Sequence, residues 1–182
     1  LRIQDLQIAM KIIEDEARKV VLNNDNASKI LNYTKDNIED VILKKRGGDY
    51  GGHGFIAEFA EAGIVNARRA IEGLNPIVKV LNDNGPADLL IGRNTIQMKF
   101  YNNLRDELAQ SFHYSEKMKM MFPKDHVLVY EKIMTGAKEV DFNGKRLSIK
   151  QITDIRQIIN DITESKGLTS YKYWMKSSVL NY

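Results

Sequence analysis

The segment from residue 77 to residue 101 constrains the fold most, because three apolar runs of strand length follow one another there. The runs are residues 77–81, 88–92 and 95–101. Turn-forming residues fill positions 82–86, and Arg93-Asn94 leaves room only for a tight connection before the third run. Runs and turns this short predict neighbouring strands of one sheet, with a hairpin formed by the second and third runs.

The third run alternates between apolar and polar side chains with a period of two residues. In it, Ile96, Met98 and Phe100 alternate with Gln97, Lys99 and Tyr101. Successive side chains of a strand leave opposite faces of the sheet, so we expect the apolar set in the core and Gln97 and Lys99 together on the other face. Asp88 opens the neighbouring strand, and hairpin pairing brings it beside both.

Helical periodicity precedes this sheet. The first 45 residues space their apolar side chains alternately by three and four, at Ile3, Leu6, Met10, Ile13 and Ala17. The segment 23–26 interrupts the pattern, and one or two further helices are expected after it. A glycine-rich run over residues 47–54 then predicts a flexible hinge, followed by a helix from about Phe55 to Glu72.

Helices also follow the sheet. They are expected over residues 104–112, over residues 125–134 with Asp125 as N-cap, and over residues 149–162. A strand over residues 117–122 and a turn at Asn143-Gly144 are expected between them. This order predicts an α/β or α+β fold with helices around a small mixed central sheet. Residues 1–46 are expected to form a helical N-terminal segment and residues 47–182 the main domain.

Composition removes several functional classes. The chain of 182 residues has no cysteine, which excludes thiol catalysis, thiolate zinc sites and disulfides. No apolar run is long enough to span a membrane. The histidines fit no metal-ligand spacing, so we expect structural or surface roles for His53, His113 and His126. Neither Ser111 nor Ser115 lies in a serine-hydrolase motif.

The charge balance is compatible with a phosphate-bearing substrate without indicating one. The chain has 27 Lys plus Arg against 24 Asp plus Glu, which gives a net charge of +3. A balance this even is not sufficient by itself to predict nucleic-acid binding.

Asp88, Gln97 and Lys99 form the constellation that predicts chemistry. A carboxylate and an amide oxygen on one face of a sheet suit Mg²⁺, which keeps several waters and accepts phosphate oxygens. Such a metal lowers the pKa of its water and polarises a phosphoryl group. A lysine beside it orients or deprotonates the attacking water, or stabilises charge on the phosphate. The sequence therefore predicts a site that hydrolyses phosphodiesters.

This arrangement resembles the PD-(D/E)XK nuclease superfamily over roughly residues 51 to 126. Gly85-Pro86-Ala87-Asp88 is similar to its first motif, with the proline two residues before the aspartate. Gln97-Met98-Lys99 is similar to the second motif in its Q-x-K form, which Mrr-like restriction nucleases share. Gly54-Phe55-Ile56-Ala57-Glu58 resembles the glutamate-bearing helix that precedes the sheet. A later Pro123-Lys124-Asp125 resembles a motif of toxin-associated nucleases.

The resemblance implies a restriction-endonuclease-like fold and a metal-dependent endonuclease. Glu58, Asp88, Gln97 and Lys99 would be the catalytic residues, and the first three would hold Mg²⁺ or Mn²⁺. The substrate would be nucleic acid, with DNA favoured over RNA.

Two biological settings fit this resemblance. One is a restriction-type enzyme. The other is the toxic C-terminal domain of a larger bacterial toxin, delivered to act in the cytoplasm of a target cell and matched by an immunity or inhibitor protein. A chain that begins at Leu1 rather than Met is expected of a processed or excised fragment.

Other interpretations remain open at several residues. Asp88 and Lys99 can be an ordinary cross-strand ion pair. Glu58 can be a surface residue, with Glu61 as the nearest competitor for its role. Asn66, two turns after Glu58, either reaches substrate or faces solvent.

Two alternatives concern the whole protein. The chain can be a non-catalytic protein-binding module whose interface is the helical N-terminus, or a nuclease-like fold that binds nucleic acid without cutting it. The aromatic and basic tail either stacks on bases or packs the C-terminal segment; it comprises Tyr171, Lys172, Tyr173, Trp174 and Lys176.

Overall fold

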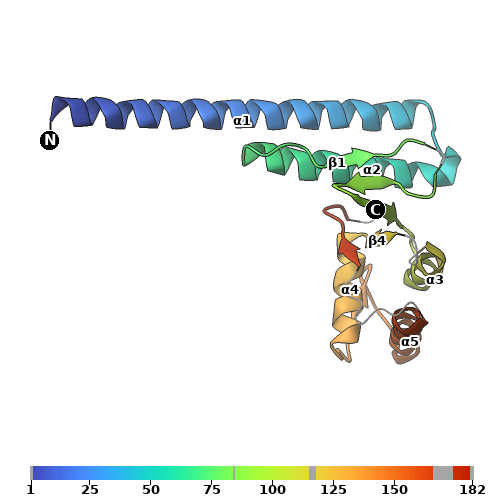
Figure 1. Ribbon diagram of the computed structural model, residues 1–182. Coiled ribbons are helices and arrows are strands. Elements are labelled where there is room, and N and C mark those ends of the chain that lie inside the picture. Colours follow the sequence, from blue (N-terminus) through green and yellow to red (C-terminus); the bar gives the residue numbers. More distant parts are fainter. Residues whose placement is uncertain (1, 84, 115–117, 166–173, 181–182) are drawn as a thin grey trace.

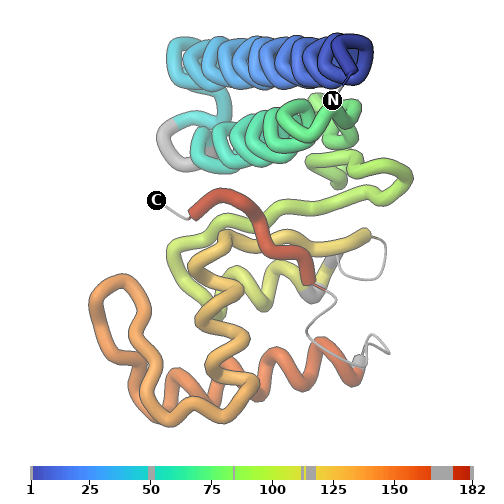
Figure 2. The backbone as a smooth tube through the Cα atoms, turned by 90° about the vertical axis from the view of Figure 1, so that its left-hand side faces the viewer, coloured from blue at the N-terminus to red at the C-terminus, as the bar shows by residue number. Residues whose placement is uncertain are grey.

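Helices lie on both sides of one mixed sheet in the computed structural model, which describes residues 2–83, 85–114, 118–165 and 174–180 (Figures 1 and 2). The helices are α1 (Ile3–Leu43), α2 (Gly48–Ile71), α3 (Leu104–Tyr114), α4 (Lys124–Met134) and α5 (Ile149–Ser165). The strands are β1 (Val78–Val80), β2 (Leu89–Ile91), β3 (Asn94–Met98), β4 (Lys119–Phe122), β5 (Asp141–Phe142), β6 (Lys145–Arg146) and β7 (Met175–Lys176). The predicted α+β class is confirmed. Among the described residues no helix is long and apolar enough to cross a membrane.

The main sheet has the strand order β1-β2-β3-β4-β7, and its first three strands are antiparallel. The expected hairpin is confirmed: Leu89 pairs with Ile96, and Gly92 takes a positive φ of 59° in the turn. β4 runs parallel to β3, and β7 runs parallel to β4. β5 and β6 form a separate ribbon through the predicted turn at Asn143-Gly144, where both residues have positive φ.

Each face of the sheet has its own apolar core. The α2 side contains Ala57, Ala62, Val78, Leu89, Ile96, Met98 and Met121. The other side packs Met120 and Phe122 against α3, α4 and α5, with Tyr130, Ile159 and Trp174 in the same cluster. Ile96 and Met98 therefore face the core as the period-two pattern predicted, and Gln97 lies on the face shared with Met120, its partner in the register.

The prediction of a helix break at residues 23–26 is wrong, because α1 continues through them for 41 residues. Asn23 donates from Nδ2 to the carbonyl of Ile71 at 3.3 Å, and Ala27 is buried against Ala67 and Ala70 of α2. The low helix propensity of residues 23–26 is a weak effect, and such tertiary contacts override it. The first part of α1 extends past α2 with exposed side chains (Figure 1).

Two further helix starts differ from the prediction. The glycine-rich run is not a hinge, because α2 already begins at Gly48 after a short connection whose N-cap, Gly47, has a φ of 80°. Asp125 is not the N-cap of α4: Pro123 has that position, with extended ψ, and Asp125 lies in the first turn. A carboxylate there still interacts favourably with the positive end of the helix dipole.

Helices α1 and α2 approach most closely where Gly63 of α2 faces Thr34 of α1. A Cβ added at Gly63 would lie 2.1 Å from Oγ1 and 2.7 Å from Cβ of Thr34. Nothing lies within 4 Å of a Cβ added at Gly54, in the same helix. The absence of a side chain at Gly63 therefore permits the helix pair that carries Glu58.

We expect Gly63→Ala and Gly54→Ala to change stability in opposite directions. Alanine favours a helix over glycine by about 1 kcal/mol, so Gly54→Ala should raise the free energy of unfolding by up to that amount. Gly63→Ala forces the two helices apart and should lower it by about 1–3 kcal/mol. Urea denaturation followed by circular dichroism measures both. Equal stabilisation by the two changes would show that α1 and α2 do not meet at this position.

Candidate active site

The β2–β3 hairpin fixes Asp88 beside Gln97. The backbone of Asp88 pairs on both sides: its amide donates to the carbonyl of Ile96 at 2.8 Å, and its carbonyl accepts from the amide of Leu81 at 2.8 Å. Its side-chain Oδ2 accepts from Nε2 of Gln97 at 2.8 Å and from the backbone amide of Met98 at 2.7 Å. The carboxylate is thus held on β3 by two donors, both of which use Oδ2 and not Oδ1.

The carbonyl oxygen of Gln97 is the unusual atom of this hairpin. Gln97 is 7% exposed, and its Oε1 is buried with no hydrogen-bond partner among the described residues. An ionised carboxylate only accepts hydrogen bonds, so the NH₂ group of Gln97 contacts Asp88 and Oε1 is the amide atom left without a donor. A buried acceptor without a donor costs free energy and is uncommon in native proteins. A bound cation or a water molecule would satisfy it.

Lys99 follows one residue after β3, where its amide donates to the carbonyl of Met121 at 3.0 Å. Its side chain is half-buried, and burial lowers its pKa, while the Asp88 carboxylate acts in the opposite direction. Burial in turn raises the pKa of Asp88, against the amide of Met98 and the charge of Lys99. Asp88 and Lys99 are therefore coupled in a partly desolvated environment, which distinguishes them from a solvated cross-strand pair.

Glu58 comes to this site from α2, next to the buried Ala57. Burial raises its pKa to about 8, and repulsion from Asp88 adds to the rise, while Arg46 lowers it. The two carboxylates thus lie close enough to interact, and Glu58 carries a proton at neutral pH. A cation bound between them would take the place of that proton.

The donor set fits a hard divalent cation. No group of three or more His, Asp or Glu side chains able to hold a metal occurs among the described residues. Two carboxylates and one amide oxygen nevertheless match the preference of Mg²⁺, which takes few protein ligands and keeps waters in the remaining positions. The unpartnered Oε1 of Gln97 is the observation that favours a cation here.

Glu61, the competitor for the role of Glu58, belongs to a different part of the molecule. It is 3% exposed, and its Oε2 accepts from Oγ of Ser177 at 2.6 Å and from the amide of Ser178 at 2.7 Å. Glu61 therefore fastens the segment after β7 to α2.

Asn66 is part-buried and bound to the edge of the sheet, a structural role that neither sequence interpretation included. Its Nδ2 donates to the carbonyl of Val78 at 2.8 Å, and its Oδ1 accepts from the amides of Ile77 and Val78 at 3.0 Å. The side-chain amide thus pairs with the edge strand β1 as another strand would, and it ties α2 to the sheet.

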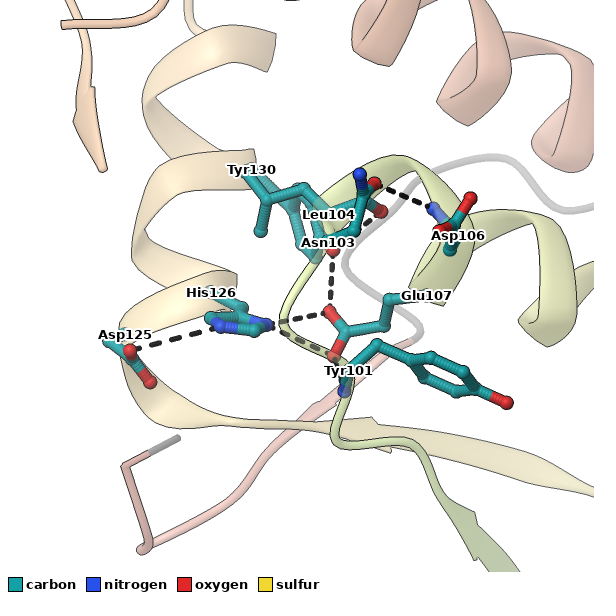
Figure 3. Close-up of polar contacts among 8 residues, drawn as sticks. All are labelled: Tyr101, Asn103, Leu104, Asp106, Glu107, Asp125, His126 and Tyr130. Carbon is teal, nitrogen blue, oxygen red and sulfur yellow. Dashed lines mark hydrogen bonds and ion pairs between the residues drawn. The ribbon is translucent and has the colours of Figure 1, made fainter. Parts of the chain in front are cut away.

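A second polar cluster, missed by the sequence analysis, supports the chain just after Lys99 (Figure 3). Glu107, His126 and Tyr130 are all fully buried. The Glu107 carboxylate contacts Nδ1 of His126 at 3.0 Å and accepts from the Tyr130 hydroxyl and from the amide of Tyr101 at 3.2 Å. Burial raises the pKa of Glu107, and these partners oppose the rise. His126 is buried in this cluster, and the sequence signal for the cluster was its i, i+4 spacing to Tyr130 on α4.

The remaining candidates are core residues, exposed residues or residues outside the described part of the chain. Trp174 is 9% exposed and packs edge-on against Phe122 and Tyr130, so it belongs to the core. Lys176 is exposed in β7, and residues 171–173 lie outside the described residues, as does Ser115. The hydroxyl of Ser111 is buried and donates to the carbonyl of Leu108 at 2.7 Å. His53 and His113 are exposed.

Comparison of the chain with protein-family models, with curated proteins and with solved structures returned no match.

The raised pKa of Glu58 predicts a pH dependence of stability. An unfolded chain loses this proton near pH 4.5 and the folded protein near pH 8, so the folded state binds more protons between these values. The contribution of Glu58 to the free energy of unfolding of the metal-free protein should therefore be greatest below about pH 4.5 and should fall, by up to a few kcal/mol, as pH rises toward 8. Denaturation in EDTA across this range measures the slope.

Glu58→Gln should remove that slope, because the glutamine carries no titrating proton. Glu61→Gln is the matched control on the same helix: it should lower stability by weakening the contacts to Ser177 and Ser178, and it leaves Glu58 in place to titrate. An unchanged slope in Glu58→Gln would show that Glu58 is not the group that retains the proton.

Proposed function

We propose that this protein is a metal-dependent nuclease that hydrolyses phosphodiester bonds in nucleic acid, with DNA favoured over RNA. The observation that carries the proposal is the Asp88–Gln97 contact, which orients a buried, unpartnered carbonyl oxygen on the face of the sheet that also bears Lys99. The coupling of Glu58 to Asp88 adds a second carboxylate.

Glu58, Asp88 and Gln97 would hold the cation, Mg²⁺ or Mn²⁺. Asp88 offers the oxygen not engaged by β3, and Gln97 offers Oε1. Glu58 gives up its proton on binding and contributes a charge. The cation would supply Lewis acidity toward the phosphoryl group and acidify its water.

Lys99 acts on the reacting groups. The water oxygen forms a bond to phosphorus, the bond from phosphorus to the leaving sugar oxygen breaks, one proton leaves the water, and the leaving oxygen takes up a proton from a solvent water. A partly buried lysine with a lowered pKa either accepts that proton or stabilises the charge that develops on the phosphate. Both roles need the ammonium group close to Asp88, with which it interacts.

The biological setting that we propose is a toxin domain or a restriction-type enzyme. A toxin domain acts on nucleic acid in the cytoplasm of the cell it enters, and the producing cell needs an immunity protein. The neutral Gln97 favours one alternative, a fold that binds nucleic acid without cutting it, because a ligand set with one charge fewer holds a divalent cation less tightly.

Cleavage assays on plasmid DNA and on RNA, with Mg²⁺ or EDTA, test the proposal. Wild-type protein should cut in Mg²⁺ and not in EDTA. Asp88→Asn, which keeps an acceptor for the Met98 amide, and Lys99→Met should each lower the rate by about 100-fold or more without unfolding the protein. Lys79→Met removes an exposed lysine from β1 and should cut like wild type.

A gel-shift on the same nucleic acids separates the alternatives. Binding without cleavage in Mg²⁺ and Mn²⁺ would establish the non-catalytic nucleic-acid-binding interpretation. The absence of both binding and cleavage would contradict the nuclease proposal and would favour the interpretation as a protein-binding module. Full activity of Lys99→Met would remove Lys99 from the chemistry.

A further inference from the structure

The short connection between α1 and α2 presents a basic side chain to the candidate site. Residues 44–46 are Lys44, Lys45 and Arg46, and Arg46 is part-buried. Its amide donates to the carbonyl of Val41 at 3.1 Å. Lys45, just before it, has a φ of 47°, a left-handed conformation that an L-residue adopts at a cost. The chain thus turns sharply at this point and directs Arg46 toward α2.

Two side chains hold the guanidinium of Arg46 in place. Its Cζ lies 4.6 Å from the centre of the Phe55 ring, over the face of that ring. Its Nη2 donates to Oδ1 of Asn82, in the connection between β1 and β2. Phe55 precedes Glu58 by three residues, so the two side chains leave the same face of α2. Arg46 is therefore fixed between the helix that carries Glu58 and the loop that leads to Asp88.

These two contacts leave other N–H groups of the Arg46 guanidinium able to donate to an anion. A guanidinium has five N–H groups in one plane, and stacking on an aromatic ring uses its face rather than these edges. Asn82 accepts from one nitrogen, and within the described residues Arg46 makes no ion pair. Because the guanidinium stacks on Phe55, one turn before Glu58 on the same face of α2, its charge lies on the side of the helix that bears Glu58.

The backbone of a nucleic acid is a polyanion, so a fixed positive charge beside an acidic site favours its approach. Planar guanidinium groups match phosphate oxygens with two parallel hydrogen bonds. We propose that Arg46, held by Phe55 and Asn82, binds a backbone phosphate of the nucleic acid and so aligns the strand over Glu58 and Asp88. This inference rests on the proposed function, because it assigns a substrate-binding residue to the same site.

Binding measured without metal tests the inference separately from cleavage. Fluorescein-labelled DNA oligonucleotides, single-stranded and duplex, are titrated in EDTA with wild-type protein and with Arg46→Gln at salt concentrations between about 50 and 200 mM. Loss of one phosphate contact should make the negative slope of log K against log salt shallower, by about 0.9 for the duplex or about 0.7 for the single strand. Binding should weaken several-fold at the lowest salt, on every sequence alike.

Matched variants separate charge from structure. Arg46→Lys keeps the charge and should keep the salt slope, with an affinity between those of wild type and Arg46→Gln. Arg18→Gln removes the same charge from the exposed part of α1, where Arg18 pairs with Glu14, and should leave the slope unchanged. Arg46→Met keeps the stem on Phe55 and replaces Arg46→Gln if that variant unfolds. In Mg²⁺, cleavage by Arg46→Gln and Arg46→Met should show a raised KM with kcat little changed, whereas Arg18→Gln should cut like wild type.

The outcomes distinguish this inference from the proposed function. Wild-type protein that binds and cuts, together with an unchanged slope in Arg46→Gln and Arg46→Met, would overturn the role of Arg46 alone. An equal loss of slope in Arg18→Gln would reduce the effect to net charge and would also overturn it. Wild-type protein that neither binds nor cuts would overturn both.

Discussion

The site depends on the hydrogen bonds that the carboxylate of Asp88 accepts from β3. One of its oxygens accepts hydrogen bonds from the backbone amide of Met98 and from the side-chain amide of Gln97. These two bonds join the start of β2 to the end of β3. The same contact decides the orientation of Gln97, because an ionised carboxylate accepts only the NH₂ group. The orphaned Oε1 of Gln97 and the remaining oxygen of Asp88 are therefore consequences of one hairpin pairing, and they are the atoms that a cation would use.

Helix α2 places the second carboxylate, and it is fastened to the sheet at two separate positions. Asn66 pairs with the free edge of β1, and Glu61 holds the segment that follows β7. On its other side, the absence of a Cβ at Gly63 lets α1 pack closely. Across the sheet, Glu107 holds the amide of Tyr101, two residues after Lys99. Buried polar contacts thus support the site from both faces, and the cost of desolvating them is offset because each has partners.

The local parts of this arrangement could be predicted from the sequence, and the non-local parts could not. Turn residues and a period of two specify a hairpin by themselves. The predicted pairing and the predicted burial of Ile96 and Met98 are therefore confirmed. Continuation of α1 through Asn23 and the early start of α2 at Gly48 depend on packing between the two helices, which local propensity does not contain. Glu58 and Glu61 have the same local context, and only the distant Ser177 separates their roles. Glu107 and His126 are likewise far apart in sequence and meet only in the folded chain.

The central claim is that Glu58, Asp88 and Gln97 form one cation site. Diffraction from crystals soaked in Mn²⁺, recorded near the manganese absorption edge, tests it most directly. We expect an anomalous peak about 2 Å from a carboxylate oxygen of Asp88, from Glu58 and from Oε1 of Gln97, with the Lys99 ammonium nearby. A protein that binds Mn²⁺ elsewhere, or that leaves Oε1 of Gln97 hydrogen-bonded to a water with no metal at saturating Mn²⁺, would contradict the claim.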